Sequence, residues 1–562
     1  YNTGLGHEAL STNTTGANNT ALGALALIEN TTGIQNIAVG GESLKRNTTG
    51  NKNTSIGMQA LSFNTTGDNN TAVGKNALYA NTTAENNTGL GFFALAANTT
   101  GTQNTAIGAY SLDANTTANT NTAIGYNSMT LTTTGASNVG VGAKSLGSNT
   151  TGASNTAVGY QSLLANTTGA NNVAVGKDSL KTNTTGYSSV SIGQGSLRDN
   201  TTGHSNVAVG DAALKENTTG SNNVAVGLSS LNSNTTGAEN TVVGKFAGEN
   251  NTTGANLVGV GYEALESNTT GGNNVALGVY SLRDNTTASN NTAVGHNSLL
   301  VNTTGANNTA LGKAALDANT TASNNTAVGY SSLGANTTGT QNVAVGGDVL
   351  ATNTTGSYNA GFGIDSLKQN TTGDFNTGIG RAAMQNNTTA DNNTAVGRNS
   401  LYSNTTGANN VSVGAIALDA NTTGHSNTGV GYDSLGANTT GVCNTAIGKG
   451  AMAATTTAEF STAVGRNAMV STTTGGANTA VGDTALGVNT TGTNNVAIGY
   501  GSLDANTTAN SNTAVGRDSL GANSTGTLNT AVGYTAGVTT TTGENNTLIG
   551  HQAGTTSSPA NI

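Results

Sequence analysis

Hydrophobic residues return along this chain at a fixed interval of 17 residues. Val39, Ile56 and Val73 follow one another at that interval, and Leu44 and Leu61 belong to a second such series. The residues between the two series are small or polar, and a glycine follows each aliphatic residue of the first series. A fixed period of this length indicates a tandem-repeat architecture.

The repeat begins at Asn13-Thr14-Thr15-Gly16 and keeps its register to Thr540, through 32 starts without insertion or deletion. Numbered from that Asn, it reads N-T-T-G-x-N-N-T-A-V-G-x-x-S-L-x-x. Position 10 is Val, Ile or Leu except at Phe362, position 11 is always Gly, and position 15 is nearly always Leu or Met. Residues 1–12 end one further repeat, so about 33 coils are expected.

The charged residues obey the same register. All 45 Asp, Glu, Lys and Arg residues fall at positions 5, 6, 12, 13, 16 and 17. Burying an unpaired charge is costly, so this rule predicts that the other positions are interior or tightly stacked. It also predicts a folded chain, since a disordered one has no reason to keep such a rule.

The period and the residue types predict an all-β, parallel β-solenoid. Seventeen residues are too few for two helices with their turns, and Gly, Asn and Thr are poor helix formers. N-T-A-V-G is β-favourable and N-T-T-G is turn-forming, so each coil is expected to hold two short strands. Coils stacked about 4.8 Å apart make a rod on the order of 150 Å long.

Stacking places equal positions above one another. Glycine at position 11 is expected at a positive-φ corner or a close backbone approach. Asn at positions 1 and 7 is expected to form amide ladders. The predicted structural ladder includes Gly23, Gly74, Gly159, Val73, Val158, Leu78 and Leu163.

The core is expected to be thin, and two arrangements fit it. Positions 9 and 10 are adjacent in a strand and face opposite sides. In the first arrangement, Ala or Ser at position 9 fills the coil while position 10 faces another copy of the chain, giving a homo-oligomer, with a trimer favoured. In the second, a monomeric coil bends so that Val and Leu both point inward.

Composition excludes several classes of protein. Only 8% of the residues are charged, the net charge is −9, and there is no basic stripe, so nucleic acid is not an expected partner. No apolar run approaches the length of a membrane span, so no membrane insertion is expected. The single Cys443 excludes an internal disulfide framework.

Two segments resemble a known family. Asn155-Thr156-Ala157-Val158-Gly159 and Ser189-Val190-Ser191-Ile192-Gly193 resemble the N-S-V-A-I-G repeat of trimeric autotransporter adhesin heads. Similar runs with N-T-T-G turns occur in bacterial and phage tail-fibre-like surface proteins. The resemblance implies a left-handed β-roll that assembles as a trimer on a cell surface, with Val158 and Ile192 on stacked apolar faces. Those heads typically have a shorter repeat.

Catalytic, metal and cofactor sites are not expected. The five His residues fall at positions 5 and 12 without a recurring carboxylate neighbour. No nucleophile–base pair or ligand spacing is present, and Asp never forms the fixed column of a calcium-binding repeat.

Three recurring features are candidates for binding or modification. N-T-T is a glycosylation sequon, although glycans on every coil would collide and a backbone-bonded turn is the alternative. Candidate acceptors are Asn13, Asn30, Asn47, Asn64, Asn81, Asn98, Asn115 and Asn149.

Exposed tyrosines at position 12 are a candidate adhesive face: Tyr126, Tyr160, Tyr262, Tyr330, Tyr432, Tyr500 and Tyr534. Regular Thr ladders make ice binding a further candidate function. That activity requires Thr side chains on one flat, outward side of the solenoid.

The sequence thus predicts a non-enzymatic extracellular fibre, a surface adhesin or fibre shaft that binds host or environmental surfaces or glycans. A self-assembling extracellular filament, stacked end to end, is the alternative, and an ice-binding solenoid is a third. The expected domain is one continuous solenoid over residues 1–554 with an end segment at 555–562. The chain is expected to begin inside a longer protein or after a removed leader.

Overall fold

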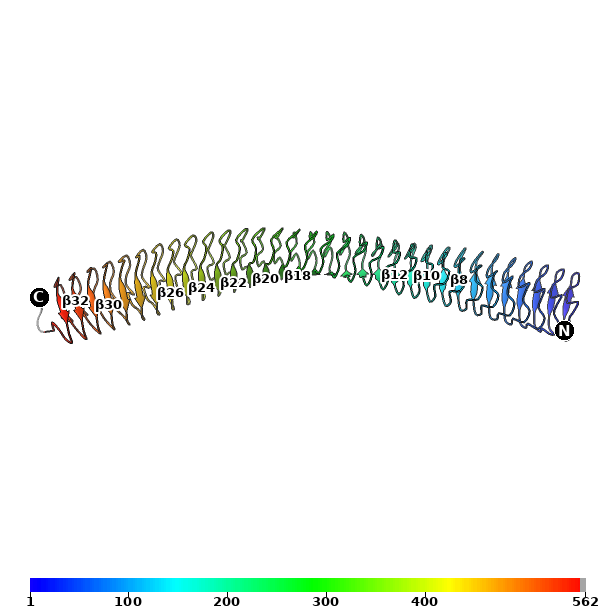
Figure 1. Cartoon of the computed structure of the whole chain (residues 1–562), viewed down its shortest axis with the longest axis horizontal. Coiled ribbons are helices and arrows are strands. Elements are labelled where there is room, and N and C mark those ends of the chain that lie inside the picture. Colours follow the sequence, from blue (N-terminus) through cyan, green and yellow to red (C-terminus); the bar gives the residue numbers. More distant parts are fainter. Residues whose placement is uncertain (556–562) are drawn as a thin grey trace. The chain divides into compact units, whose positions relative to one another are not determined.

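The computed structural model describes residues 1–555, which form a parallel β-solenoid with one coil for each 17-residue repeat (Figure 1). The all-β solenoid of about 33 coils predicted from the repeat is confirmed. The chain divides into two compact units, Tyr1–Thr287 and Ala288–Ile562, and each is described by itself. The single continuous domain over 1–554 stays a prediction. Of the expected end segment 555–562, all but Thr555 lies outside the described residues.

Each coil contributes one three-residue strand, formed by positions 8 to 10 of the repeat. In the first unit the strands are β1 Thr3–Leu5, β2 Thr20–Leu22, β3 Ile37–Val39, β4 Thr54–Ile56, β5 Thr71–Val73, β6 Thr88–Leu90, β7 Thr105–Ile107, β8 Thr122–Ile124, β9 Val139–Val141, β10 Thr156–Val158, β11 Val173–Val175, β12 Val190–Ile192, β13 Val207–Val209, β14 Val224–Val226, β15 Thr241–Val243, β16 Val258–Val260 and β17 Val275–Leu277.

In the second unit the strands follow the same pattern. They are β18 Thr292–Val294, β19 Thr309–Leu311, β20 Thr326–Val328, β21 Val343–Val345, β22 Ala360–Phe362, β23 Thr377–Ile379, β24 Thr394–Val396, β25 Val411–Val413, β26 Thr428–Val430, β27 Thr445–Ile447, β28 Thr462–Val464, β29 Thr479–Val481, β30 Val496–Ile498, β31 Thr513–Val515, β32 Thr530–Val532 and β33 Thr547–Ile549. No helix in the part of the chain that the structure describes is long and apolar enough to cross a membrane.

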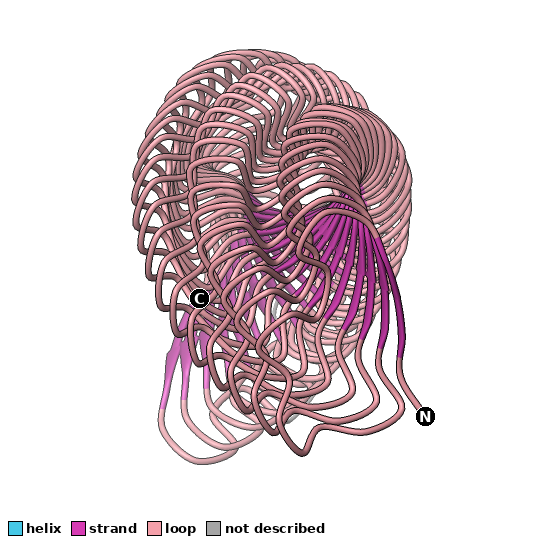
Figure 2. Cartoon of the chain, turned by 90° about the vertical axis from the view of Figure 1, so that its right-hand side faces the viewer, coloured by secondary structure: helices cyan, strands magenta, loops and turns pink. Residues whose placement is uncertain are grey.

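Consecutive strands within a unit pair in parallel and in register, so equal positions of the repeat lie side by side. Between β10 and β11, for example, Thr156 lies beside Val173 and Val158 beside Val175. Figure 2 shows the strands as short magenta segments on one side of coils that are otherwise loop.

The expectation of two strands per coil is wrong, and backbone geometry gives the reason. Residues at positions 13 and 15 take left-handed conformations, as at Asn76 (φ 58°), Leu78 (φ 52°) and Leu163 (φ 50°). An extended strand cannot contain such residues. This side of the coil still bonds to its neighbour, since the Leu78 N–H donates to the Ala94 carbonyl at 2.9 Å.

The core lies inside the coil and is built from positions 9, 14 and 15. Ala157 and Leu163 are fully buried, whereas Val158 is 37% exposed. The alternative in which Val and Leu both point inward is therefore wrong. Strand alternation sends position 10 outward, and the position-15 leucine takes the space inside.

The charge rule marks interior positions only in part. Positions 2 and 3, as at Thr31 and Thr32, and positions 8 and 10 lack charges, yet they are exposed or half-exposed. The interpretation of every charge-free position as interior or tightly stacked is wrong for these four.

Both predicted Asn ladders are confirmed. At position 1, Asn47 Nδ2 donates to Asn30 Oδ1 of the preceding coil at 2.7 Å and to the Gly50 carbonyl of its own coil at 2.9 Å. At position 7, the Asn36 N–H donates to Asn19 Oδ1 at 2.9 Å, and Asn36 Nδ2 donates to the Gly50 carbonyl at 2.8 Å. These fully buried amides satisfy backbone groups of the turn that would otherwise lack partners.

The position-11 glycines form a third ladder. They show both expected features, a positive φ and a close approach to the backbone of the next coil. Gly23, Gly74 and Gly159 have φ of 139°, 131° and 135°, a conformation that side-chain-bearing residues rarely adopt. A β carbon on Gly159 would lie 2.5 Å from the carbonyl oxygen of Gly176 in the next coil. The left-handed sense of the coil that the family resemblance implies stays a prediction.

Candidate functional site

The outward side of the strands is an extended surface that repeats the same chemistry from coil to coil in each unit. We call it the strand face, and it consists of the side chains at positions 8 and 10. Position 8 is Thr or Val in 31 of the 33 strands, with Ile37 and Ala360 as the others. Position 10 is aliphatic in all of them except at Phe362. Val158 and Ile192, which the resemblance places on stacked apolar faces, lie on the strand face and are 37% and 41% exposed.

This face is exposed but carries no charge, which sets it apart from the other exposed positions. All 45 charged side chains lie at six other positions of the repeat, and solvent reaches most of those positions to a similar degree. Exposure alone therefore does not explain why charge is missing from positions 8 and 10. The apolar row at position 10 runs through every strand, and an exposed apolar row of this length marks an interaction site.

The strand face is most apolar in the middle of the first unit. From β11 to β14 position 8 is Val in each strand, and position 10 is Val or Ile. These eight side chains are Val173, Val175, Val190, Ile192, Val207, Val209, Val224 and Val226.

The position-12 tyrosines lie next to the strand face, directly after the glycine corner. All seven are exposed: Tyr126 54%, Tyr160 47%, Tyr262 36%, Tyr330 57%, Tyr432 52%, Tyr500 53% and Tyr534 44%. They are spread over both units and form no single cluster. Most have a ring or cation neighbour, such as Lys449 over Tyr432 at 6.0 Å and Arg517 over Tyr500 at 5.3 Å.

A cluster of four aromatic rings was missed by the sequence analysis. Phe92 contacts Phe93 and Tyr110 with ring centroids 4.6 and 5.3 Å apart, and Tyr110 contacts Tyr126 at 6.4 Å. The signal was present in the sequence, because positions 12 and 13 of neighbouring coils lie together once the register is known. Looking for tyrosine at position 12 alone excluded the phenylalanines and Tyr110.

A second aromatic group carries acidic neighbours. Tyr262 packs against Phe246 and Tyr280 at 6.3 and 5.5 Å. A hydrogen bond with the Glu263 carboxylate raises the pKa of Tyr262 to about 12. Burial is the main cause that raises the pKa of Glu249 and of Glu266, and the charge of Glu263 raises both further.

The candidate glycosylation residues are poorly placed for modification of the folded protein. Asn30, Asn47, Asn64, Asn81, Asn98, Asn115 and Asn149 are fully buried. A glycan would be attached at Nδ2, which in Asn30 donates to Asn13 Oδ1 at 2.8 Å and to the Gly33 carbonyl at 3.1 Å. In Asn13 it donates to the Gly16 carbonyl at 3.0 Å. The local turn bonding therefore accounts for the recurrence of N-T-T-G along the chain without a glycan.

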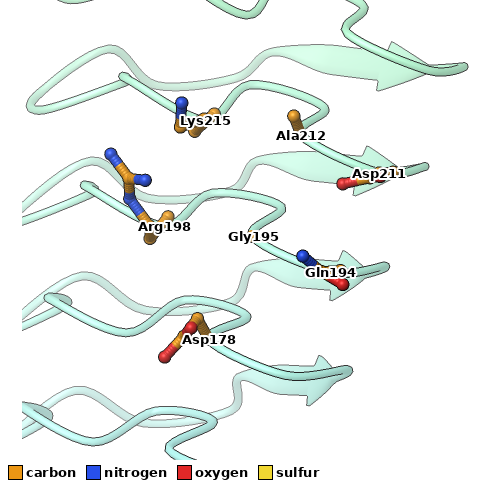
Figure 3. Close-up of a pocket in the computed structure, with 7 residues that line it drawn as sticks. All are labelled: Asp178, Gln194, Gly195, Arg198, Asp211, Ala212 and Lys215. Atoms are coloured by element: carbon orange, nitrogen blue, oxygen red, sulfur yellow. The ribbon is translucent and has the colours of Figure 1, made fainter.

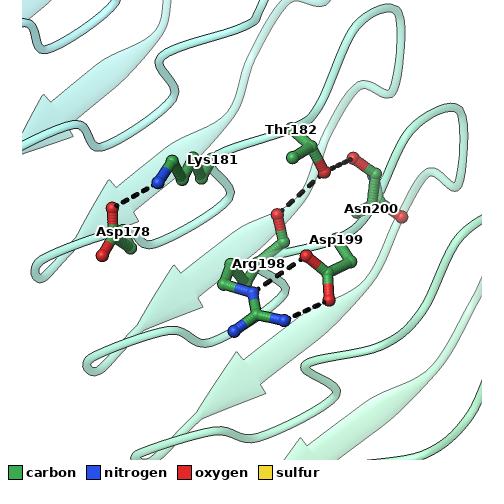
Figure 4. A network of polar contacts seen from close by, with 6 residues as sticks. All are labelled: Asp178, Lys181, Thr182, Arg198, Asp199 and Asn200. Carbon is green, nitrogen blue, oxygen red and sulfur yellow. Dashed lines mark hydrogen bonds and ion pairs between the residues drawn. The ribbon is translucent and has the colours of Figure 1, made fainter.

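A charged hollow of about 230 Å³ lies beside β11 to β13, where Gly195 lacks a side chain at position 13 (Figure 3). Asp178, Asp211, Arg198 and Lys215 line it. Arg198 and Asp178 have charged partners that do not line the hollow, as Figure 4 shows. Arg198 makes two hydrogen bonds to Asp199, at 2.9 and 2.7 Å, and Lys181 lies 3.2 Å from Asp178.

A second hollow of about 210 Å³ lies after β8 and β9. It exists because Gly147 stands at position 16 between Thr130 and Leu164 of the adjoining coils. Leu131, 50% exposed, lies on its wall together with Asn127 and Lys144. The wall combines the apolar side chains of Leu131 and Leu164 with several polar groups, so it offers both apolar surface and hydrogen-bonding groups to a ligand.

No metal-binding cluster of three or more His, Cys, Asp or Glu residues occurs among residues 1–555. His204 and His551 stack on Tyr187 and Tyr534, at 4.6 and 5.2 Å between centroids. Cys443 is exposed and free. We interpret these residues as variable surface residues without a catalytic or metal-binding role.

In the comparison with known proteins, no family model matches this chain, and a search of the curated proteins finds no match.

Proposed function

We propose that this chain is the shaft of an extracellular fibre, a non-enzymatic segment that gives reach and displays binding residues many times over. Its copies associate side by side through the strand face as a homo-oligomer, with a trimer as the favoured form. The observation that carries the proposal is the strand face itself, which is exposed along both units and free of charge in every strand of the described chain.

The size of the strand face supports this association. Positions 8 and 10 lie about 7 Å apart along a strand, and neighbouring strands about 4.8 Å apart. Seventeen strands in the first unit therefore carry a face about 77 Å long and on the order of 10 Å wide. The resulting area is close to the roughly 800 Å² that one partner contributes to a standard stable interface.

The fibre role draws on the same repetition. A solenoid of identical coils presents each exposed position many times, and weak contacts at several copies add up through multivalency. The low charge, the single cysteine and the absence of a nucleophile–base pair in the sequence fit a structural protein in an extracellular setting.

The association is tested with three forms of the full-length chain. The first is the wild type, and the second carries Val190→Lys and Val207→Lys on the strand face. The third carries Ser188→Lys and Ser205→Lys, which add the same charge at position 6, where Lys52 occurs naturally. Analytical ultracentrifugation is expected to give an oligomer for the wild type and the serine variant. The valine variant is expected to associate at least tenfold more weakly.

A wild-type chain that stays monomeric at micromolar concentration would contradict the association. Electron microscopy of native particles tests the fibre role: rods of fixed length support a shaft, whereas indefinite filaments favour end-to-end assembly. Labelling of intact cells with a membrane-impermeant reagent tests the extracellular location.

Ice binding is a second candidate, favoured by one observation. Five consecutive strands, β4 to β8, place Thr outward at position 8: Thr54, Thr71, Thr88, Thr105 and Thr122. Outward threonine on one side was the condition that the sequence analysis set for this activity. Thermal hysteresis of the full chain, abolished by Thr88→Lys with Thr105→Lys, would support it, and its absence at millimolar protein would exclude it.

A further inference from the structure

Three aromatic side chains form a spaced row along the first unit. Phe92, Tyr126 and Tyr160 occupy position 12 of alternate coils and are 40%, 54% and 47% exposed. Ala109 and Ala143 occupy position 12 of the coils between them. Successive rings are therefore about 9.6 Å apart along the stack, twice the strand spacing of about 4.8 Å.

That spacing matches the length of the disaccharide unit in a straight β-linked glycan of the cellulose or chitin type. In such a chain every second sugar presents the same face to the same side. Three rings two coils apart would thus each meet an equivalent sugar face. Ala143 leaves room for a sugar between Tyr126 and Tyr160. Between Phe92 and Tyr126 the ring of Tyr110 extends the aromatic surface.

Neighbouring rings hold part of the row in place. Tyr110, at position 13 of the coil between Phe92 and Tyr126, contacts both, with centroids 5.3 and 6.4 Å apart. Phe93 stacks on Tyr110 with an angle of 20° between the ring planes. Packed rings lose less conformational freedom when a ligand binds than free ones do.

The hollow at Gly147 adjoins this row and supplies polar contacts. Asn127 on its wall is the next residue after Tyr126. Its volume, about 210 Å³, is below the range of drug-sized pockets and suits a single sugar unit. Thr130 on the wall donates to the Asp113 carboxylate at 2.6 Å, so polar groups that can bond to sugar hydroxyl groups lie on and next to this wall.

A peptide fits this surface less well. Extended peptides are usually recognised by adding a strand to an open sheet edge. Here β6 to β10 each pair with a strand on both sides, so no edge is open. Recognition must therefore use side chains, and flat rings with hydroxyl and amide groups suit the apolar faces and hydroxyl edges of sugars.

We infer that Phe92, Tyr126, Tyr160 and the hollow at Gly147 form a binding site for an extended, uncharged β-linked glycan of about five sugars. This inference deepens the proposed adhesive display by naming its ligand class. It does not depend on association through the strand face, which lies on positions 8 and 10.

Isothermal titration calorimetry of the full-length chain tests the site with cellohexaose and chitohexaose as extended probes. Cellobiose and chitobiose are the short probes, and maltohexaose is the curved one. We expect at least one extended hexasaccharide to bind, at least tenfold more tightly than its disaccharide and than maltohexaose.

Four variants separate the site from the rest of the surface. Tyr126→Ala removes the middle ring, and Gly147→Leu fills the hollow with a residue that position 16 already carries at Leu164. Each is expected to weaken hexasaccharide binding at least tenfold. Tyr330→Ala and Tyr432→Ala remove position-12 tyrosines outside the row and are expected to leave binding unchanged. Circular dichroism checks that all four fold.

Three outcomes would overturn the site: no hexasaccharide binding by the folded wild type, equal loss in the control variants, or binding of a proline-rich peptide with none of the sugars. A chain that binds glycan as a monomer would overturn the strand-face association alone. A chain that assembles without binding glycan would overturn this site alone.

Discussion

Gly159 lies so close to Gly176 of the next coil that a β carbon on Gly159 would be 2.5 Å from the Gly176 carbonyl oxygen. Real β carbons do not approach a carbonyl oxygen this closely. The φ of Gly159 is 135°, which side chains also disfavour. Two independent restrictions therefore require glycine at position 11, which explains why the repeat tolerates no other residue there.

Replacing Gly159 by Ala should open the solenoid locally. The strained backbone and the forced separation from Gly176 together cost about 3 kcal/mol. Repeat proteins respond through nearest neighbours, so amide hydrogen exchange should speed up in β10 and β11 and remain slow in distant coils of the same unit.

Gly347→Ala is the matched control for this prediction. Gly347 follows a position-11 glycine, but a β carbon there would meet nothing within 4 Å. Its exchange pattern and its urea midpoint should equal those of the wild type. Equal destabilisation by both alanines would show that the close approach of Gly159 and Gly176 is unimportant.

The buried Asn ladder should tolerate a hydroxyl but not a carboxylate. In Asn47→Asp, an oxygen replaces the nitrogen that donates to Asn30 Oδ1 and the Gly50 carbonyl. A buried carboxylate then faces two acceptors without a counter-charge, which should cost about 3 kcal/mol at pH 7. Asn47→Thr should cost about 1 kcal/mol, because Thr132 and Thr472 occupy the same position naturally.

Urea unfolding at pH 7 and pH 3 checks the Asn47 variants. Protonation at pH 3 restores a donor to the aspartic acid. The difference in free energy of unfolding between Asn47→Asp and Asn47→Thr should therefore be smaller at pH 3 than at pH 7. A gap that does not change with pH would mean that the charge is not the cause.

The sequence predicted the stacking of the coils more fully than the path of the chain within one coil. A strict 17-residue register is enough to place like residues beside like, so the Asn and Gly ladders followed directly from it. The charge rule failed at Val158 because absence of charge has two causes, burial and an exposed face that excludes it. The rule alone cannot separate these, whereas strand alternation can.

The left-handed conformation of the position-15 leucines could not be predicted from residue type. Leu163 has φ 50° although leucine normally avoids that region. Burial of its side chain compensates for the backbone cost, and burial is not visible before the fold is known. Glycine at the same position in Gly248, Gly537 and Gly554, with φ of 58°, 64° and 74°, was the available hint.

Leu528 is a position-6 residue where this cost has no compensation. It has φ 59° and is 56% exposed. Asparagine adopts this conformation more readily and is found there in Asn69 and Asn171. Leu528→Asn should therefore stabilise the second unit by about 1 kcal/mol, measured as a higher urea midpoint.

The same exchange at Leu131 is the control, since Leu131 is 50% exposed but is not among the positive-φ residues. Leu131→Asn should give no gain in stability. A gain at both sites would indicate that loss of exposed apolar surface, and not the backbone, raises the midpoint.

Asp317 should make the protein less stable at neutral pH than in mild acid. Burial raises the pKa of Asp317 above its ordinary value of 3.8, so the folded state favours the protonated carboxyl. Its contribution to stability is therefore fully present below about pH 3.8 and is lost as the pH rises through the folded-state pKa.

Asp317→Asn removes the charge, and its free energy of unfolding should exceed that of the wild type at pH 7. The difference should vanish at pH 3, where both side chains are neutral, and urea unfolding across this range measures it. A stabilisation that persists at pH 3 would assign the effect to shape or hydrogen bonding and not to the buried charge.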